Sequence, residues 1–127
     1  MKKVIKIDER EVGFKATALT PRLYRHFLGR DMISDMVKLK KAYRKAEELP
    51  EDVTEEERKE AQLSVLDLEI FENAAWIMAW QYDTEAAGSD PNAWLDGFET
   101  FSIYEVLPEI LVLWDMNQQT TAMPKKK

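Results

Sequence analysis

Apolar and polar residues alternate in two short stretches near the start of the chain, residues 2–7 and 11–16, on either side of a charged segment at 8–10. The alternating apolar positions are Val4 or Ile5, Ile7, Val12 and Phe14. This period-two pattern around a polar turn predicts a β-hairpin over residues 1–17. Because a lone hairpin is marginal in water, we expect it to pack on the rest of the chain or to pair with another copy.

The remainder of the chain has helical spacing, and the first helix is short. Thr20 followed by Pro21 is typical of an N-cap and a first helical position. The pattern predicts a helix over residues 22–28, and Gly29 is suited to end it.

The second helix is predicted from its cap, Asp31, to about Glu47, with Pro50 as the breaker. One face of this helix carries large apolar side chains, and two β-branched residues lie beside them. These positions are Met32, Met36, Leu39 and Tyr43, with Ile33 and Val37 next to them.

A third helical pattern starts at the capping box of residues 54–57 and runs without a breaker to Ala87. One helix of that length would measure roughly 50 Å, whereas a compact domain of this size has a radius of gyration of about 14 Å. Its polar first turns therefore project from the body, or the helix breaks near Gln62. Residues 70–80 are apolar on nearly all sides, which predicts the central, buried helix of the fold.

Two more helices are predicted toward the end of the chain. Asp90 with the following proline begins a short helix through Phe98, and the capping box from Ser102 to Glu105 opens the last helix. Pro108 predicts a kink in that helix, or else the main helix begins near this proline. The wide apolar face consists of Ile103, Val106, Leu107, Ile110, Leu111 and Trp114.

Together these elements predict a mainly α (α+β) fold, with an N-terminal β-hairpin followed by a compact bundle of about five helices around a central buried helix. A chain of 127 residues fits one domain. We assign residues 1–117 to a single globular domain, with the hairpin at 1–17 and the helices at 20–117. Residues 118–127 have no apolar pattern and are expected to form a flexible C-terminal tail.

Composition narrows the possible chemistry. The chain has no cysteine, so disulfides and thiol chemistry are excluded and zinc loses its commonest ligands. No apolar run approaches the roughly 20 residues needed to cross a bilayer, so we expect no membrane partner. With no signal peptide discernible, the expected location is the cytoplasm.

Charge is distributed unevenly along the chain. Residues 1–45 carry 13 Lys and Arg against 5 Asp and Glu, whereas residues 46–122 carry 2 against 19. This asymmetry suits two faces for two partners, or head-to-tail self-association. The simpler interpretation is that each half only solvates its own surface.

The sequence offers little basis for catalysis. His26 is the only histidine, and no serine or cysteine partner can be named for it, so we interpret it as a surface or packing residue. With only four glycines there is no Gly-rich phosphate loop. We therefore expect no catalytic residue and no cofactor, and we predict that the protein is not an enzyme.

Polar residues on the central helix have the spacing of a carboxylate metal site. Glu69 and Glu72 are three residues apart on one face, next to Asp67 and Asn73. A carboxylate di-iron site would also need a histidine three residues after a glutamate and a second such pair, and neither occurs. We expect no metal and interpret these residues as polar breaks that pair with Arg or Lys from the N-terminal half.

The basic stretch Arg22–Lys45 suggests nucleic-acid binding, since two short helices around Gly29 faintly resemble a helix-turn-helix. The acidic remainder would repel a duplex, so we expect no nucleic-acid partner. The alternative function is that of a small DNA-binding regulator that uses the basic helices of Arg22–Lys45.

Three segments together resemble a known family. They are residues 14–25 with 29–31, residues 66–76, and residues 98–111 running into 118–127. In their order and spacing the chain resembles the tail assembly chaperones of long-tailed phages and prophages of Gram-positive bacteria, over nearly its whole length.

The resemblance implies a function. Proteins of this family bind the long, aggregation-prone tape measure protein before the tail tube polymerises around it, and they are absent from the mature virion. A programmed frameshift near the end of the gene appends a second domain, and the extended form recruits tail tube subunits. For this chain the resemblance implies a location in the host bacterial cytoplasm. Because ribosomes slip on adenine runs, we hypothesise that Lys125–Lys127 mark the site of the frameshift.

A chaperone of this kind needs exposed apolar surface with a polar rim. The expected partner-binding residues combine basic side chains with an adaptable apolar stripe. They are Arg22, Arg25, Arg30, Met32, Ile33, Met36, Val37, Lys40 and Lys41. The alternative interpretation is that the stripe is ordinary core. The hairpin edge and the opposed charges would then join copies into oligomers.

Overall fold

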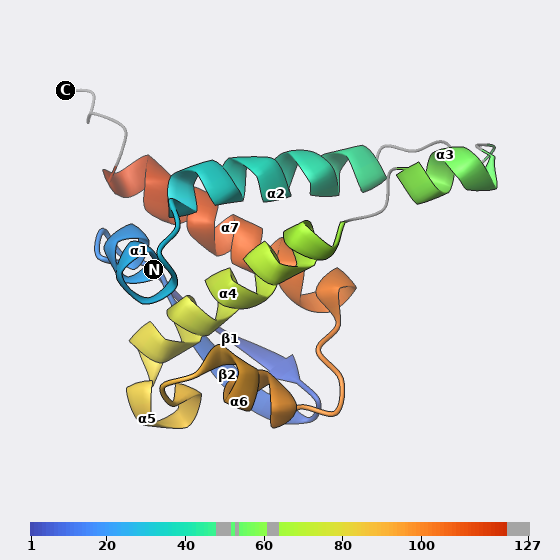
Figure 1. Cartoon of the computed structure of the whole chain (residues 1–127). Coiled ribbons are helices and arrows are strands. Elements are labelled where there is room, and N and C mark those ends of the chain that lie inside the picture. Colours follow the sequence, from blue (N-terminus) through green and yellow to red (C-terminus); the bar gives the residue numbers. More distant parts are fainter. Residues whose placement is uncertain (48–51, 53, 61–63, 122–127) are drawn as a thin grey trace.

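The computed structural model describes residues 1–47, 52, 54–60 and 64–121. These residues form a two-stranded antiparallel hairpin followed by seven helices, which confirms the α+β class (Figure 1). The elements are β1 (Lys2–Ile7), β2 (Arg10–Lys15), α1 (Thr20–Leu28), α2 (Met32–Glu47), α3 (Glu55–Glu60), α4 (Val65–Tyr82), α5 (Thr84–Ala87), α6 (Pro91–Asp96) and α7 (Ile103–Thr121).

Helix α4 is the centre of the fold, as its apolar sequence predicted. Six consecutive residues, 74–79, are each at most 3% exposed, and Ile70 and Phe71 are also buried. A helix buried on every side must be surrounded, and α4 packs against α1, α2, α5, α6, α7 and β2. In Figure 1 the helix α2 lies on one side of α4 and the hairpin on the other.

The hairpin packs on the helices through one face. Ile7 and Phe14 are buried and Ile5 and Val12 lie against the core, whereas Val4 is 51% exposed on the opposite face. The alternation therefore has Ile5, not Val4, on the inner side. The two-residue turn of the hairpin holds Asp8 and Glu9 at positive φ, 54° and 64°. This conformation suits the twist of a tight hairpin.

The hairpin turn is also tied to the loop between α6 and α7. Arg10 donates a hydrogen bond to the Gly97 carbonyl at 2.8 Å, and its guanidinium lies 4.3 Å from the centre of the Phe98 ring. The Asp8 carboxylate accepts a hydrogen bond from the Glu99 N–H at 3.0 Å. These contacts show that the hairpin packs on the rest of the chain, which was the first of the two expected possibilities.

Helix α1 begins earlier than predicted, and Thr20 is not its N-cap. Leu19 occupies the N-cap position without a side-chain cap, and Thr20 is the first helical residue, fully buried. The Thr20 hydroxyl accepts from the Thr17 N–H and donates to the Gln81 side chain of α4. This long-range bond outweighs the local capping preference. Gly29 ends the helix in the left-handed conformation, as predicted.

A partly buried polar network joins three parts of the chain near this point. The Gln81 amide donates to the Thr17 hydroxyl at 2.6 Å, and Asn117 of α7 donates to the Thr17 carbonyl at 3.0 Å. Thr20 and Asn117 are 0% and 2% exposed. Because buried polar groups need partners, this network fixes how α1, α4 and α7 meet.

The long third helix of the prediction is not continuous among the described residues. Helices α3 and α4 are separate, and Ser64 starts α4 with a capping box, in which its hydroxyl accepts from the Asp67 N–H and Asp67 bonds back to the Ser64 N–H. The break near Gln62 was thus the better alternative, although residues 61–63 lie outside the described part. Helix α4 also ends at Tyr82 rather than Ala87, because Asp83 is extended and caps α5.

The last two helices follow the predicted caps with small shifts. Asp90 accepts from the Asn92 N–H to cap α6, which ends at Asp96 instead of Phe98. Helix α7 begins at Ile103 and runs through Pro108, so the alternative start near this proline is wrong. The kink itself stays a prediction.

Helix α7 continues to Thr121, four residues past the predicted domain boundary at 117. Residues 118–121 are therefore helical rather than a tail without secondary structure. The rest of the predicted tail, including Lys125–Lys127, lies outside the described residues. Of the helices that are described, none combines the length and the apolar character needed to span a membrane.

Candidate functional site: a basic face on the first two helices

The outward side of α2 carries an exposed apolar pair, and helical periodicity explains its position. Met32, Met36 and Leu39 recur at intervals of four and three residues and are at most 1% exposed, so they face the core. Ile33 and Val37 each follow a core residue by about 100° and are 52% and 62% exposed. The expected stripe therefore divides into a buried and an exposed half.

The buried half corrects the predicted partner surface. Met32 and Met36 pack in the core, as the alternative interpretation had it, and they are not available to a partner. Both belong to the hydrophobic core, and their helix α2 packs against α4. Ile33 and Val37 are the only members of the apolar set at the surface.

Basic side chains surround this pair. One surface hollow at the junction of α1 and α2 is lined by Arg22, Arg25, Arg30 and Ile33 among others. A second hollow along α2 is lined by Val37, Lys40, Lys41, Arg44 and Lys45. We call the exposed basic and large apolar residues of these hollows the basic face: Arg22, Arg25, Ile33, Val37, Lys41, Arg44 and Lys45. The exposed Asp31 also lines the first hollow.

Arg44 and Lys45 were not among the predicted site residues. Their signal was present in the sequence, because Arg44 lies seven residues after Val37 and Lys45 lies four residues after Lys41. Both spacings return to the same side of a helix.

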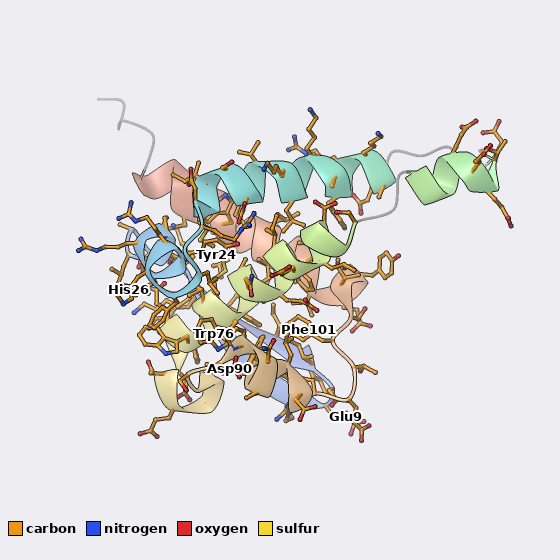
Figure 2. The ribbon with its side chains drawn as sticks, viewed as in Figure 1. Glu9, Tyr24, His26, Trp76, Asp90 and Phe101 are labelled. Atoms are coloured by element: carbon orange, nitrogen blue, oxygen red, sulfur yellow. The ribbon has the colours of Figure 1, made fainter. Side chains whose placement is uncertain are left out.

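Arg30 has a structural role as well as a place at this surface. Its guanidinium makes two hydrogen bonds to the Asp35 carboxylate, at 2.6 and 2.9 Å. The buried Tyr24 hydroxyl donates to the same carboxylate at 2.8 Å. Figure 2 shows Tyr24 where α1 meets α2. The network therefore locks the angle between these two helices.

The electrostatics of this network follow from burial and hydrogen bonding. Burial and the Asp35 carboxylate together raise the pKa of Tyr24 well above its ordinary value. Burial alone would raise the pKa of Asp35, but hydrogen bonds from Arg30 and Tyr24 and the charge of Arg30 outweigh it, so the pKa is lowered. Asp35 thus stays ionised inside the fold.

Lys40 is likewise engaged within the molecule. Its ammonium group contacts the Asp115 carboxylate of α7 at 2.7 Å, which ties α2 to the last helix. Of the nine predicted partner-binding residues, two are therefore buried and two are in intramolecular ion pairs. Arg22, Arg25 and Ile33 remain exposed around the first hollow, and Val37 and Lys41 remain exposed around the second.

The acidic residues of α4 do not pair as expected. Glu69 is exposed and Glu72 is half-buried, and in the described part of the chain neither forms an ion pair. Burial, and then the nearby Glu69 charge, raise the pKa of Glu72. The basic half instead reaches α7, through Lys40 to Asp115 and Lys3 to Glu109.

The single histidine lies on the surface. His26 is exposed on α1 (Figure 2). Its ring lies edge-on to Phe27, at 5.2 Å between ring centres. Among residues 1–47, 52, 54–60 and 64–121, no three His, Asp or Glu side chains are grouped closely enough to hold a metal ion.

Comparisons with known proteins found no relative. No protein-family model, no curated protein and no solved structure matches the chain.

Proposed function

We propose that this protein is a phage tail assembly chaperone that binds the tape measure protein and keeps it soluble until the tail tube polymerises. The proposal rests on the three-segment resemblance, together with the exposed pair Ile33 and Val37 inside a basic rim. An apolar centre with a polar, charged rim is the usual composition of a protein interface.

The basic face suits a helical client whose contact side is apolar and whose flanks are acidic. Ile33 and Val37 are one helical turn apart, so they match the spacing of apolar anchors on a second helix packed alongside α2. Arg22, Arg25 and Lys41 would meet acidic side chains at the edges of that contact. The longer, frameshifted form of the chaperone would bring tail tube subunits to the same complex.

Co-expression with the tape measure protein tests this proposal. We expect the wild-type chain to keep the tape measure protein in the soluble fraction, and the double variant Ile33→Ser, Val37→Ser to lose most of that effect. Tyr104→Ser is the matched control, because Tyr104 is an 81% exposed apolar side chain on α7, outside the basic face. A tape measure protein that is equally insoluble with and without the wild-type chain would refute the proposal.

The basic face could also serve the alternative function, DNA binding by a small regulator. A small DNA-binding regulator would use the basic residues of α1 and α2, so it would retain mixed-sequence DNA in a gel-shift assay. We expect no retention at physiological salt, because the acidic remainder of the chain repels phosphate. DNA retention that is abolished by the double variant Arg22→Glu, Arg25→Glu would favour the regulator.

Mass spectrometry of purified virions tests a separate part of the proposal, that the protein is absent from the finished particle.

A further inference from the structure

The hydrogen-bonding pattern of the hairpin follows from the pair that lies just beyond its strands. The Ala16 N–H donates to the Met1 carbonyl at 2.9 Å, and the Met1 amine donates to the Ala16 carbonyl at 3.0 Å. Met1 and Ala16 are therefore a hydrogen-bonded pair, next to the register pair Lys2 and Lys15. Hydrogen-bonded and non-hydrogen-bonded pairs alternate along an antiparallel ladder.

This alternation determines which backbone groups of β1 point away from β2. Lys2, Val4 and Lys6 are in non-hydrogen-bonded pairs, so their N–H and C=O groups lie along the outer edge of β1. Among the described residues none of these groups bonds to another element. Lys2 and Lys6 are exposed and Val4 is 51% exposed. Because unpaired backbone groups are rarely buried, this edge faces water.

The outer edge of β2 is less accessible. Its outward-pointing residues are Glu11, Gly13 and Lys15, and the ring of Tyr82 lies against Gly13. Strand β2 also packs against α4, and Glu11 and Gly13 line a hollow together with residues of α4, α5 and α6. Strand β1 contacts α7, and this contact includes Lys3, which lies on the face opposite Val4. Of the two hairpin edges, the edge of β1 is therefore the one that a further strand can reach.

We propose that the outer edge of β1 binds an extended acidic segment of a partner protein, which adds to the hairpin as a third strand. An unpaired strand edge offers a ladder of donors and acceptors that only another extended chain can match. Directly opposite side chains on neighbouring strands lie about 5 Å apart. Acidic residues would therefore stand opposite Lys2 and Lys6, and an apolar residue opposite Val4.

The same charges disfavour a second copy of β1 as the occupant. If two β1 strands paired antiparallel about Val4, Lys2 of each copy would stand directly opposite Lys6 of the other. Like charges in directly opposite positions are destabilising. The two lysines therefore act against edge-to-edge self-association and in favour of an acidic strand. This inference stands on the hairpin alone and does not depend on the proposed chaperone function.

Backbone amide NMR of the full chain, titrated with the peptide Thr-Glu-Thr-Val-Thr-Glu-Thr, tests the proposal. We expect the amide signals of Lys2, Val4 and Lys6 to shift and their hydrogen exchange to slow. The control peptide carries lysine in place of both glutamates and should bind roughly 2- to 30-fold more weakly, because two cross-strand charge pairs become repulsive. No saturable binding at millimolar peptide, or shifts confined to the basic face, would overturn the proposal.

The variant Val4→Pro tests binding at the outer edge of β1 without disrupting the hairpin. Proline removes the outward N–H of Val4 without removing a bond to β2, and edge strands tolerate proline at such positions. We expect peptide binding to weaken roughly tenfold, with an unchanged circular dichroism spectrum and thermal midpoint. Val4→Thr keeps the N–H and should bind like the wild type. Equal binding by Val4→Pro would contradict strand addition.

A charge swap covers the case in which Val4→Pro fails to fold. The double variant Lys2→Glu, Lys6→Glu alters no ion pair seen among the described residues. It should reverse the preference, so that the lysine peptide binds more tightly than the glutamate peptide. An unchanged preference, or dimers cross-linked through β1, would exclude the acidic strand as the occupant.

Discussion

The ring of Tyr82, at the end of α4, lies directly against the Cα of Gly13 in strand β2, where a β-carbon on Gly13 would overlap three ring atoms. Helix and strand approach this closely because Gly13 has no side chain. The glycine is therefore required for space rather than for an unusual backbone angle.

Gly13→Ala is expected to lower the free energy of unfolding by about 1 kcal/mol through overpacking. The cost is modest because Tyr82 is 43% exposed and its ring can move outward. Urea unfolding measures it. In a Tyr82→Ala background the same substitution should be neutral or slightly stabilising, since alanine suits a strand better than glycine. A penalty that persisted without the ring would show that another contact is responsible.

The Asp35 network predicts a loss of stability in acid. The pKa of Asp35 is lowered in the folded state. Its contribution to the free energy of unfolding is therefore complete above the unfolded pKa of about 3.9, and it is lost as the pH falls through the folded pKa. Asp35→Asn should therefore be less stable than the wild type at pH 7, and the difference should shrink below about pH 4. Denaturant unfolding across this range measures the difference. A constant gap would mean that ionisation of Asp35 does not stabilise the fold.

Asn117→Ala is expected to destabilise the fold by about 1 kcal/mol, because the hydrogen bond from the buried Asn117 amide to the Thr17 carbonyl is lost while that carbonyl keeps the Thr20 N–H. Val112→Ala on the same helix is the control, since Val112 is 49% exposed and its truncation should change stability by less than about 0.5 kcal/mol. Thermal unfolding compares the two. Similar effects for both variants would argue that the Asn117 bond contributes little.

Self-association of the pure protein should depend on salt. The basic face lies on α1 and α2, whereas α3 exposes Glu55, Glu56 and Glu57. Contacts between such opposed surfaces of two copies weaken as salt shortens the Debye length to about 3 Å at 1 M. Small-angle scattering is expected to show larger particles at low salt than at high salt. A strict monomer at high protein concentration and low salt would contradict the prediction.

The terminal lysines are predicted to act partly through the messenger RNA. Recoding Lys125–Lys127 to interrupt any run of adenines, without changing the protein, should abolish a longer frameshifted product. Immunoblotting with an antibody against the N-terminal domain detects both forms. A longer product that persists after recoding would rule out slippage at these codons.

Local patterns in the sequence were enough to predict most of the elements. Period-two alternation located the hairpin, Gly29 and Asp31 marked the boundary between α1 and α2, and the run at 70–80 identified the central helix. Each of these signals depends on neighbours within a few residues, so no tertiary information was needed. The capping box of Ser64 and Asp67 is an equally local signal that the sequence interpretation missed. It starts α4 and so divides the helical pattern predicted over residues 54–87.

Tertiary contacts decided the rest. The Thr20 hydroxyl bonds to Gln81, 61 residues away, in place of capping its own helix. Which half of the α2 stripe is exposed depended on where α4 lies, since Met32 and Ile33 are equally apolar neighbours in sequence. The sequence by itself determined where helices and strands form, because those preferences are short-range. Only the tertiary structure decided which side chains remain for a partner, because exposure depends on elements that are distant along the chain.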